Sequence, residues 1–281
     1  MTVPTLTLND QAQIPQLGFG VFQVPPPQTA EVVSQALEVG YRHIDTAQMY
    51  QNERGVGDAL KATDIPREEL WITSKLNNGF HRPDDARRAF DETLTRLGLE
   101  QIDLFLIHWP LPTRYDGDYV STWRTLIEFL EDGRARSIGV SNFQPAHLDR
   151  IVAETGVVPA VNQIEVHPYF TNDDAREASH RHGVAVESWS PIAQGGVLDD
   201  ETIGKIAAAH GRTPSQVTLR WHVERGDIVF PKTMRRERME ENFAIFDFEL
   251  SPDEVAAISA LDRGEKGRTG PNPDEFDWIP S

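Results

Sequence analysis

The sequence contains no cysteine among its 281 residues. This absence excludes disulfide bonds, thiolate metal sites and cysteine nucleophiles, and a reducing cytoplasm is the simplest setting for such a chain. Basic residues are also few, since 27 Lys and Arg stand against 44 Asp and Glu, giving a formal net charge of −17. A charge of this sign repels the phosphates of nucleic acids and disfavours binding to anionic membranes.

Long hydrophobic runs are missing as well. No run approaches the roughly 20 residues that a membrane-spanning helix needs. Residues 1–4 show neither a charged segment nor an apolar one, so we expect no secretory signal. With 39% hydrophobic and 25% charged residues, the composition is that of a globular protein with a sizeable core. No interdomain linker is visible, and we expect a single domain over residues 1–281, cytoplasmic and monomeric.

Eight short apolar runs predict strands, and longer amphipathic segments lie between them. The runs cover residues 16–19, 41–44, 70–74, 104–107, 137–140, 161–164, 184–188 and 228–230. Several are apolar on both faces, which is typical of a parallel sheet that is buried on both sides. Apolar stripes at helical spacing precede Gly40, Gly98 and Gly133, which are plausible helix ends.

Eight strand–helix units in about this length predict a (β/α)8 TIM barrel. The alternative is a doubly wound open sheet, which should show G-x-G-x-x-G after its first strand. Here Gly18-Phe-Gly20 lacks the third glycine, and no helix is predicted to start there.

Further elements are expected outside the eight units. Residues 5–8 and 13–16 predict an N-terminal β-hairpin. Thr213 to Gln216 and Ser251 to Glu254 have the form of capping boxes, and the second predicts an extra C-terminal helix. Residues 264–281 are rich in Gly, Pro and acids and predict a C-terminal loop.

Polar or aromatic side chains follow most of the predicted strands. Because active sites of barrels lie at the carboxyl ends of the strands, we expect these side chains to converge on one mouth. They are Asp45, Lys75, His108, Ser141, Asn142, Gln163, Trp189, Lys232 and Thr233. No G-x-S-x-G nucleophile motif is present.

No metal site is expected. We take His43 and Asp45 to lie on opposite faces of a strand, and His180 and His182 to diverge on a helix. The zinc motif H-E-x-x-H is absent from the sequence.

Four residues could together reduce a carbonyl. A tyrosine has a pKa near 10, and a lysine within a few Å lowers it. We therefore expect Lys75, kept charged by Asp45, to lower the pKa of Tyr50 so that its phenol can protonate a developing alkoxide. His108 would orient and polarise the carbonyl. No side chain donates hydride, so a cofactor is required.

The sequence resembles the aldo-keto reductases over essentially its whole length. The matching stretches are Gly40 to Ala47 with Tyr50, Glu53 and Gly57; Ile72 to Lys75; Asp103 to Pro110; Gly139 to Phe143; Asn162 to Glu165 with His167 and Pro168; Ser188 to Pro191; and Phe230 to Thr233 with Arg238, Glu241 and Asn242. Two further segments are most similar to those of the prokaryotic branch that includes 2,5-diketo-D-gluconate reductases, namely Gly211 to Pro214 and Arg220 to His222.

The resemblance implies a TIM barrel that reduces aldehydes and ketones with NADPH and without metal. Tyr50 would be the general acid, assisted by Lys75 and Asp45, and His108 would orient the carbonyl. The implied cofactor-binding residues are Ser141, Asn142 and Gln163 for the carboxamide, Trp189 and Ser190 at the nicotinamide ring, Lys232, Thr233 and Arg238 for the 2′-phosphate, and Glu241 and Asn242 on the adenine side. Trp189 stands where many relatives have Tyr, and stacking needs only an aromatic face.

The predicted substrate pocket contains Phe22, Asn77 and Trp109. Asn77 replaces a frequent aromatic, which favours hydroxylated or dicarbonyl substrates, but Asn is also a common turn residue. The candidate substrates are 2,5-diketo-D-gluconate, methylglyoxal and related dicarbonyls. Residues 111–120 and the tail would supply specificity loops, and we expect Trp278, a large aromatic in a polar tail, to dock on the protein.

Alternative interpretations remain at this point. The basic residues Arg235 and Arg236 have a plain alternative role in ion pairs with Glu237, Glu240 and Glu241. The chain could be a non-catalytic module that senses NADP(H) occupancy. It could also be a metal-dependent barrel hydrolase, although it lacks a convincing ligand set.

Overall fold

The computed structural model describes residues 3–280. Residues 1 and 2, which begin the stretch expected to lack a signal, lie outside the described residues. So does residue 281, the last residue of the expected domain.

Eight parallel strands form the centre of the molecule, each paired with the next in chain order. They are β3 (Phe19–Gly20), β4 (His43–Asp45), β5 (Trp71–Leu76), β6 (Ile102–Ile107), β7 (Ala135–Ser141), β8 (Val161–Glu165), β9 (Ala185–Trp189) and β10 (Ile228–Val229). Every one lies at a predicted apolar run. These strands are buried on both faces because helices cover the outside and side chains fill the inside.

The sheet closes between its first and last strands. Leu17, just before β3, forms a parallel bridge with Val229 of β10. Gly18 N donates to Val229 O at 2.8 Å, and Val229 N donates to Gln16 O at 3.0 Å. The predicted TIM barrel is therefore confirmed, and the alternative of an open doubly wound sheet is wrong.

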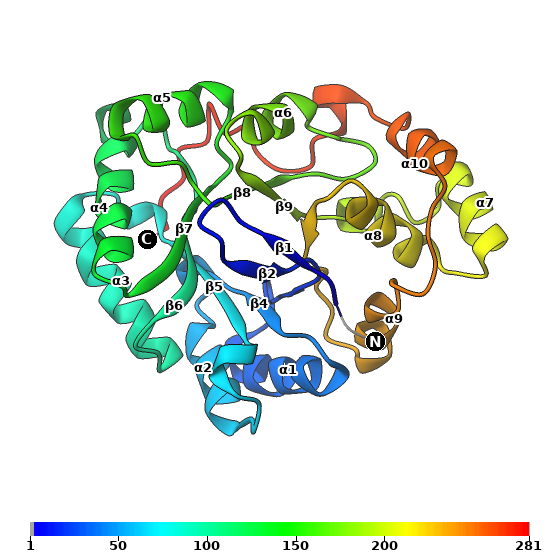
Figure 1. The fold of residues 1–281 in the computed structure, drawn as a ribbon, viewed down its shortest axis with the longest axis horizontal. Helices are drawn as coiled ribbons and strands as arrows, with labels where there is room; N and C mark the ends of the chain where they lie inside the picture. The colour runs from blue at the N-terminus through cyan, green and yellow to red at the C-terminus, as the bar shows by residue number, and fades with distance from the viewer. Residues whose placement is uncertain (1–2, 281) are drawn as a thin grey trace.

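Helices surround the barrel, as the view in Figure 1 shows. They are α1 (Pro26–Val39), α2 (Glu53–Ala62), α3 (Pro83–Leu97), α4 (Tyr119–Glu131), α5 (Pro145–Thr155), α6 (Asp173–Arg181), α7 (Glu201–His210), α8 (Pro214–Glu224), α9 (Arg236–Phe243) and α10 (Pro252–Ser259). The apolar stripe of α1, with Val33 and Ala36 fully buried, faces the barrel.

Local sequence signals fix where the helices begin and end. Gly40 follows α1 with a φ of 126°, a conformation that a residue with a Cβ rarely adopts. Thr213 and Ser251 cap α8 and α10 in complete capping boxes, so both predicted boxes are confirmed. The second box opens the expected extra C-terminal helix.

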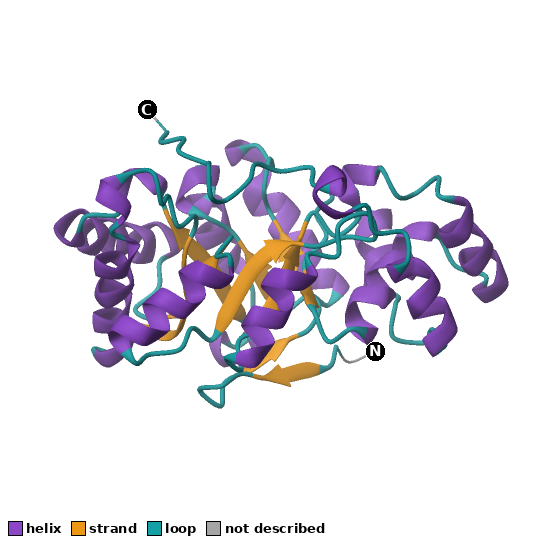
Figure 2. Ribbon diagram, turned by 90° about the horizontal axis from the view of Figure 1, so that it is seen from above, coloured by secondary structure: helices purple, strands orange, loops and turns teal. Residues whose placement is uncertain are grey.

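The hairpin and the tail lie at opposite ends of the barrel (Figure 2). β1 (Thr5–Thr7) and β2 (Gln13–Pro15) form the expected antiparallel hairpin. Its Ile14 packs with Trp71 and Ile228, which are the first residues of their strands, so the hairpin covers the amino ends. The tail after the short helix η6 (Gly264–Gly267) has no regular structure and crosses the other end, as the predicted C-terminal loop.

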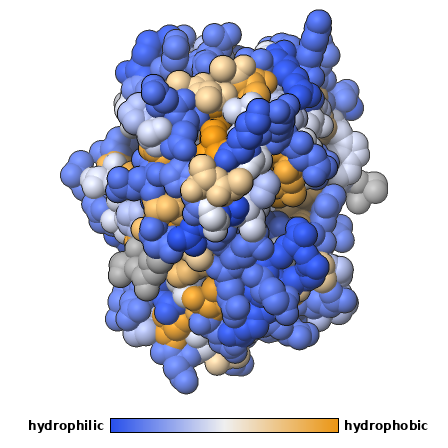
Figure 3. All heavy atoms as spheres, turned by 90° about the vertical axis from the view of Figure 1, so that its right-hand side faces the viewer, coloured by the Kyte–Doolittle hydropathy of each residue, from blue (hydrophilic) through white to orange (hydrophobic). Residues whose placement is uncertain are grey.

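The surface offers few large apolar side chains. Among residues 3–280, the exposed large hydrophobics are Phe22, Met234 and Trp278. The side of the molecule that includes α7 and α10 is mostly hydrophilic, with small apolar areas (Figure 3). Within the described part of the chain, no helix combines the length and apolarity needed to cross a membrane.

Candidate active site

Three of the predicted catalytic side chains meet at the carboxyl ends of β4 and β5. Lys75 Nζ lies 2.7 and 2.8 Å from the two carboxylate oxygens of Asp45 and also donates to Thr46 O at 2.8 Å. The Tyr50 hydroxyl, in the short helix η1 (Gln48–Tyr50), is 3.5 Å from Lys75 Nζ. Lys75 is fully buried, so its charge depends on these partners.

The electrostatics of this group follow from burial opposed by pairing. Burial lowers the pKa of Lys75, but the negative charge of Asp45 and the nearby Tyr50 raise it by more, so Lys75 remains an ammonium. Burial raises the pKa of Tyr50 above its usual value, and the lowering contribution of Lys75 does not overcome it. The expected net lowering of the Tyr50 pKa is therefore wrong for this structure, because the phenol lies in a poorly hydrated site. Lys75 does act in the expected direction.

His108 follows β6 and lies beside Tyr50. The two ring centroids are 5.7 Å apart in an edge-to-face arrangement. Burial and then the charge of Lys75 hold the pKa of His108 well below its ordinary range, so the imidazole is neutral. Its buried Nδ1 has no partner among residues 3–280. The mouth of the barrel thus places a phenol and a neutral imidazole next to each other.

Gln163 of β8 lies beneath this group and bridges two acids. Its Nε2 donates to Asp45 Oδ2 at 2.9 Å and to Glu187 Oε2 at 2.8 Å. Glu187 belongs to β9 and is fully buried. Sequence reasoning missed Glu187, although a charged residue inside an otherwise apolar predicted strand was a visible signal.

Ser141, Asn142 and Trp189 form a second connected group on the same rim. Asn142 Nδ2 donates to His108 O at 2.9 Å and to Ser141 Oγ at 3.0 Å. The Trp189 indole N–H donates to Asn142 Oδ1 at 2.8 Å. Asn142 thus holds the Trp189 ring in place, and both of its own N–H groups are used within the protein. Ser190, next in the chain, is in the left-handed region with a φ of 50°.

The four basic residues between positions 232 and 238 lie on the surface, and only one of them is ion-paired within residues 3–280. Arg236 forms ion pairs with Glu38 and Glu240, which confirms the plain interpretation for that residue. Lys232 and Arg238 are exposed and form no ion pair within residues 3–280, and the same holds for Arg235, whose expected pairing is not found. Free cations in a protein with a charge of −17 are suited to an anionic ligand.

The remaining cofactor candidates of this region already make hydrogen bonds within the protein, Thr233 to its own loop and Glu241 and Asn242 to the start of α8. Thr233 Oγ1 accepts from the backbone N–H of Arg235 at 3.2 Å. Glu241 accepts from the Thr213 hydroxyl at 2.6 Å, and Asn242 Oδ1 accepts from Ser215 Oγ at 3.0 Å. The contacts of Glu241 and Asn242 tie α9 to the start of α8.

The predicted pocket residues differ in how they lie. Phe22 is 54% exposed, and its ring centroid is 5.0 Å from that of Tyr50. Trp109 is buried and packs on Phe276 of the tail at 4.2 Å. The side-chain oxygen of Asn77 accepts from Gly79 N at 2.9 Å, so it stabilises a turn. This oxygen therefore does not support the interpretation of a polar substrate pocket.

The tail docks through residues that the sequence did not reveal. Asn78 donates to Trp278 O at 2.9 Å, but Trp278 as a whole residue is 53% exposed. The expectation that this ring docks is therefore wrong: the backbone of Trp278 is bound, and Phe276 is the aromatic that packs. Trp278 lies in a polar segment without periodicity, so its sequence could not tell backbone docking from side-chain docking.

A second tail contact is made by Glu165 at the end of β8. Its Oε1 accepts from Thr269 N at 2.6 Å, from Thr269 Oγ1 at 2.5 Å and from Gly270 N at 3.2 Å. His167 Nε2 lies 3.1 Å from the same oxygen. A Cβ on Gly270 would lie 2.4 Å from the Trp189 ring, so the tail backbone packs directly on that indole.

No metal centre is found among residues 3–280, since no group of three His, Asp or Glu side chains there could hold an ion. One expectation about geometry is wrong, however. His43 and Asp45 both point into the barrel, because residues two apart on a strand share a face. Glu187 shows this: its Oε1 is 3.9 Å from His43 Nε2, and Gln163 links it to Asp45.

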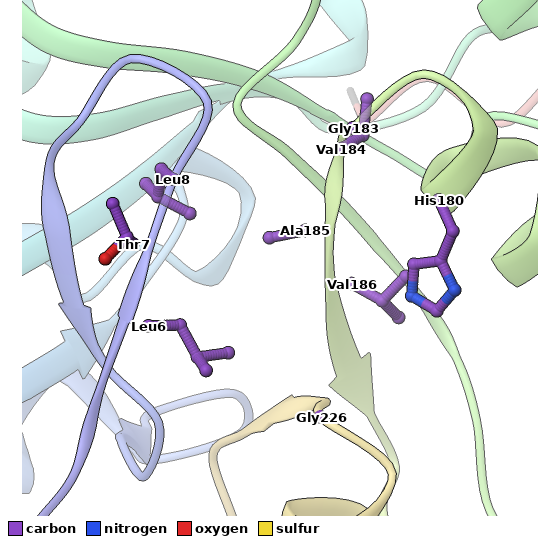
Figure 4. A pocket seen from close by; sticks show the side chains of 9 residues that line it. All are labelled: Leu6, Thr7, Leu8, His180, Gly183, Val184, Ala185, Val186 and Gly226. Atoms are coloured by element: carbon purple, nitrogen blue, oxygen red, sulfur yellow. The ribbon is translucent and has the colours of Figure 1, made fainter.

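A surface hollow of about 280 Å³ lies at the end of the barrel opposite the mouth that holds the candidate catalytic residues (Figure 4). Leu6 and Leu8 of the hairpin line one side, and Ala185 at the start of β9 lines another. His180 is the only titratable side chain in its lining. The hollow therefore lacks the converging polar groups that the other end of the barrel has.

Comparisons with known proteins agree with this geometry. The profile described as "Aldo/keto reductase family" matches residues 16–263. A protein from Yersinia pestis named methylglyoxal reductase DkgA is 48% identical over 276 residues, covering 97% of both chains. An aldo-keto reductase from Mycolicibacterium smegmatis is 46% identical over 275 residues, covering 98% of both. A crystal structure of a Gox0644 mutant in complex with NADPH superposes with a TM-score of 0.94 at 44% identity, covering 99% of this chain and 100% of that one.

Proposed function

Because this chain belongs to the aldo/keto reductase family, we propose that it reduces small aldehydes and ketones to alcohols with NADPH, and that Tyr50 donates the proton. The observation that carries the proposal is the chain of contacts from Asp45 through Lys75 to Tyr50 at the mouth of the barrel. His108 stands beside Tyr50 at the same place.

The residues at the mouth can perform the proton transfer in a defined order. A Tyr50 pKa above its usual value keeps the phenol protonated at neutral pH, which is the form that a general acid needs. The phenol gives its proton to the carbonyl oxygen, and Lys75 stabilises the phenolate that remains. His108, as a neutral imidazole, donates a hydrogen bond that orients the carbonyl.

The rim fits NADPH, which when bound supplies the hydride to the carbonyl carbon. Lys232 and Arg238 present cations without ion-pair partners in the described residues, as a 2′-phosphate requires. Trp189, held by Asn142, offers an aromatic face to the nicotinamide ring. Ser141, Gln163 and Ser190 would bind the rest of the nicotinamide end, with Thr233, Glu241 and Asn242 on the phosphate and adenine side.

Dicarbonyls are the substrate class that we propose. A relative of 48% identity is named methylglyoxal reductase, and the branch indicated by the sequence includes 2,5-diketo-D-gluconate reductases. The partly exposed Phe22 and the buried Trp109 would line an opening suited to a small substrate. The cytoplasmic setting and the monomeric state stay predictions.

The test compares Tyr50→Phe with the wild type and with the control Tyr119→Phe. Tyr119 is a buried tyrosine of α4 that packs on Phe143, away from Lys75. NADPH affinity is measured by quenching of tryptophan fluorescence, and turnover by NADPH oxidation with methylglyoxal, an aromatic aldehyde and a diketo sugar acid. Tyr50→Phe should lose about 10²–10⁴-fold in kcat while its NADPH affinity stays within about twofold.

Two results would contradict the proposal. A Tyr50→Phe variant with most of its activity would remove Tyr50 as the proton donor. Wild-type protein that binds NADPH but turns over none of the three carbonyls would instead favour a redox-sensing module.

A further inference from the structure

The side chain of Glu187 accepts fewer hydrogen bonds than a buried carboxyl group normally does. It is fully buried on β9, yet its one hydrogen bond from a described residue comes from Gln163 Nε2, at 2.8 Å to Oε2. Its Oε1 has no hydrogen-bond partner among residues 3–280, and His43 Nε2 lies 3.9 Å from it. Buried polar groups are normally satisfied, so this one calls for a physical reason.

The reason lies in the amide that Glu187 holds. The Nε2 atom of Gln163 carries two hydrogens, and it has two acceptors, Asp45 Oδ2 at 2.9 Å and Glu187 Oε2 at 2.8 Å. Two acceptors fix both the direction of the amide and the plane in which it lies. A flipped amide would place its oxygen against two carboxyl groups. The Gln163 oxygen must therefore point away from Asp45 and Glu187, and no residue between 3 and 280 donates to it.

We propose that Glu187 is a positioning residue for the cofactor: through Gln163, it holds an amide oxygen ready to accept a hydrogen bond from the carboxamide N–H of nicotinamide. The proposal rests on the NADPH-dependent function proposed above. Glu187 itself need not touch the cofactor, because Gln163 lies between Glu187 and the rim residues Ser141 and Asn142, with its backbone oxygen bound to both.

The charges around Glu187 explain why a carboxyl can serve here without disturbing the catalytic group. It faces Asp45 and His43 from β4, Lys75 from β5 and Gln163 from β8. Burial, and then the negative charge of Asp45, raise the pKa of Glu187 to about 8 against the lowering by Gln163 and Lys75. A neutral carboxyl accepts from Gln163 while adding no second negative charge beside the Asp45–Lys75 pair.

The experiment uses the full chain and a pair of cofactors that differ in one group. One is NADP⁺, and the other is its 3-acetylpyridine analogue, in which a methyl group replaces the carboxamide NH₂. Dissociation constants are measured by quenching of tryptophan fluorescence. The variants are Glu187→Leu, which removes the acceptor, and Glu187→Gln, whose carbonyl oxygen still accepts from Gln163. Glu187→Met is a second apolar variant if Glu187→Leu does not fold.

We expect Glu187→Leu to weaken NADP⁺ binding about tenfold and binding of the analogue by less than about twofold. Glu187→Gln should restore NADP⁺ affinity to within about twofold of the wild type. Gln163→Leu should show the same cofactor-dependent loss, because both changes remove one contact.

Equal loss for both cofactors in Glu187→Leu would overturn the inference, since Glu187 would then have only a structural role. Unchanged affinity for both would overturn it as well. Wild-type protein that binds neither NADP⁺ nor NADPH would overturn the proposed function itself, which is a different outcome.

Discussion

Two glutamates on neighbouring strands are both shielded from solvent, but one carboxyl group is ionised and the other is neutral. Glu165 of β8 and Glu187 of β9 are 1% and 0% exposed. Burial raises the pKa of Glu165, but hydrogen bonds from His167, Thr269 and Gly270 lower it by more, so the net pKa lies below its usual value. Glu187 accepts from a single donor in the described part of the chain, and its pKa rises to about 8.

The difference shows that the number of hydrogen-bond donors and the charge of a neighbouring acid, acting on top of burial, set the charge of these two carboxyl groups. Glu165 is an anion that fastens the tail to the mouth through main-chain and hydroxyl donors. Glu187 is a neutral acid in a group whose single cation, Lys75, already serves Asp45. One side chain type therefore performs two tasks, a charged anchor and an uncharged acceptor.

The largest effect should come from removing that cation with Lys75→Met. Asp45 would lose its ion pair in a buried site, and Tyr50 would lose the charge that stabilises its phenolate. We expect kcat for carbonyl reduction to fall by about 10²–10⁴-fold. Lys205→Met is the control, because Lys205 is exposed and, within residues 3–280, forms an ion pair only with Glu201 of its own helix. Retained activity in Lys75→Met would show that Lys75 does not assist Tyr50.

The pH dependence of stability should separate the two glutamates by sign. Glu187 has a folded pKa near 8 against an unfolded value near 4.5, so its stabilising contribution is full below about pH 4.5 and is lost as the pH rises to 8. Glu165 has a lowered pKa, so its contribution is present above about pH 4.5 and is lost as the pH falls.

Urea unfolding of Glu187→Gln and Glu165→Gln between pH 3.5 and 8.5 checks these signs. Relative to the wild type, Glu187→Gln should gain stability as the pH rises from about 5 to 8. Glu165→Gln should be most destabilised at neutral pH and should approach the wild type in acid. If the free energies of unfolding of the two variants changed with pH in the same way, the carboxyl groups of Glu187 and Glu165 in the wild type would titrate alike.

A graded series at the tail should give smaller changes. Glu165→Ala removes the carboxylate that accepts hydrogen bonds from Thr269 and Gly270 of the tail. This change should lower the free energy of unfolding by about 2 kcal/mol. Thr269→Val removes only the hydroxyl donor and should cost about 1 kcal/mol. Hydrogen exchange at the Gly270 amide should accelerate in both variants, more so in Glu165→Ala. An unchanged Gly270 rate would mean that other contacts hold the tail.

The smallest effect should come from an ion-paired arginine on the surface. Arg236 bonds to Glu38 and Glu240, but all three side chains are largely exposed. Exposed ion pairs are screened and contribute little, so Arg236→Ala should leave the unfolding midpoint in urea unchanged within error. A clear shift would show that solvent exposure is a poor guide to the charges of this protein.

The fold was predictable because its signals are local. Each of the eight strands is an apolar run, and Gly40, Thr213 and Ser251 mark helix boundaries through their own conformational or capping preferences. The convergence of Asp45 and Lys75 also followed, because the carboxyl ends of parallel strands meet at one mouth.

The rest depends on contacts that no local pattern encodes. Glu165 meets Thr269 across 104 residues, and the tail has no periodicity to announce the contact. The net pKa of Tyr50 depends on how much water the folded site excludes, which the spacing of residues does not give. The turn formed by Asn77 and the exposure of Trp278 depend on the folded surroundings of these residues and not on their local sequence.

The closure of the barrel also has a consequence for synthesis of the chain. Gln16 hydrogen-bonds to Asp227 O, 211 residues away, and β3 finds its second lateral neighbour only in β10. A growing chain on the ribosome must therefore carry an open strand edge until almost all of it has emerged. Open edges pair readily with other chains, so unfinished copies of this protein are expected to need chaperones more than the finished enzyme does.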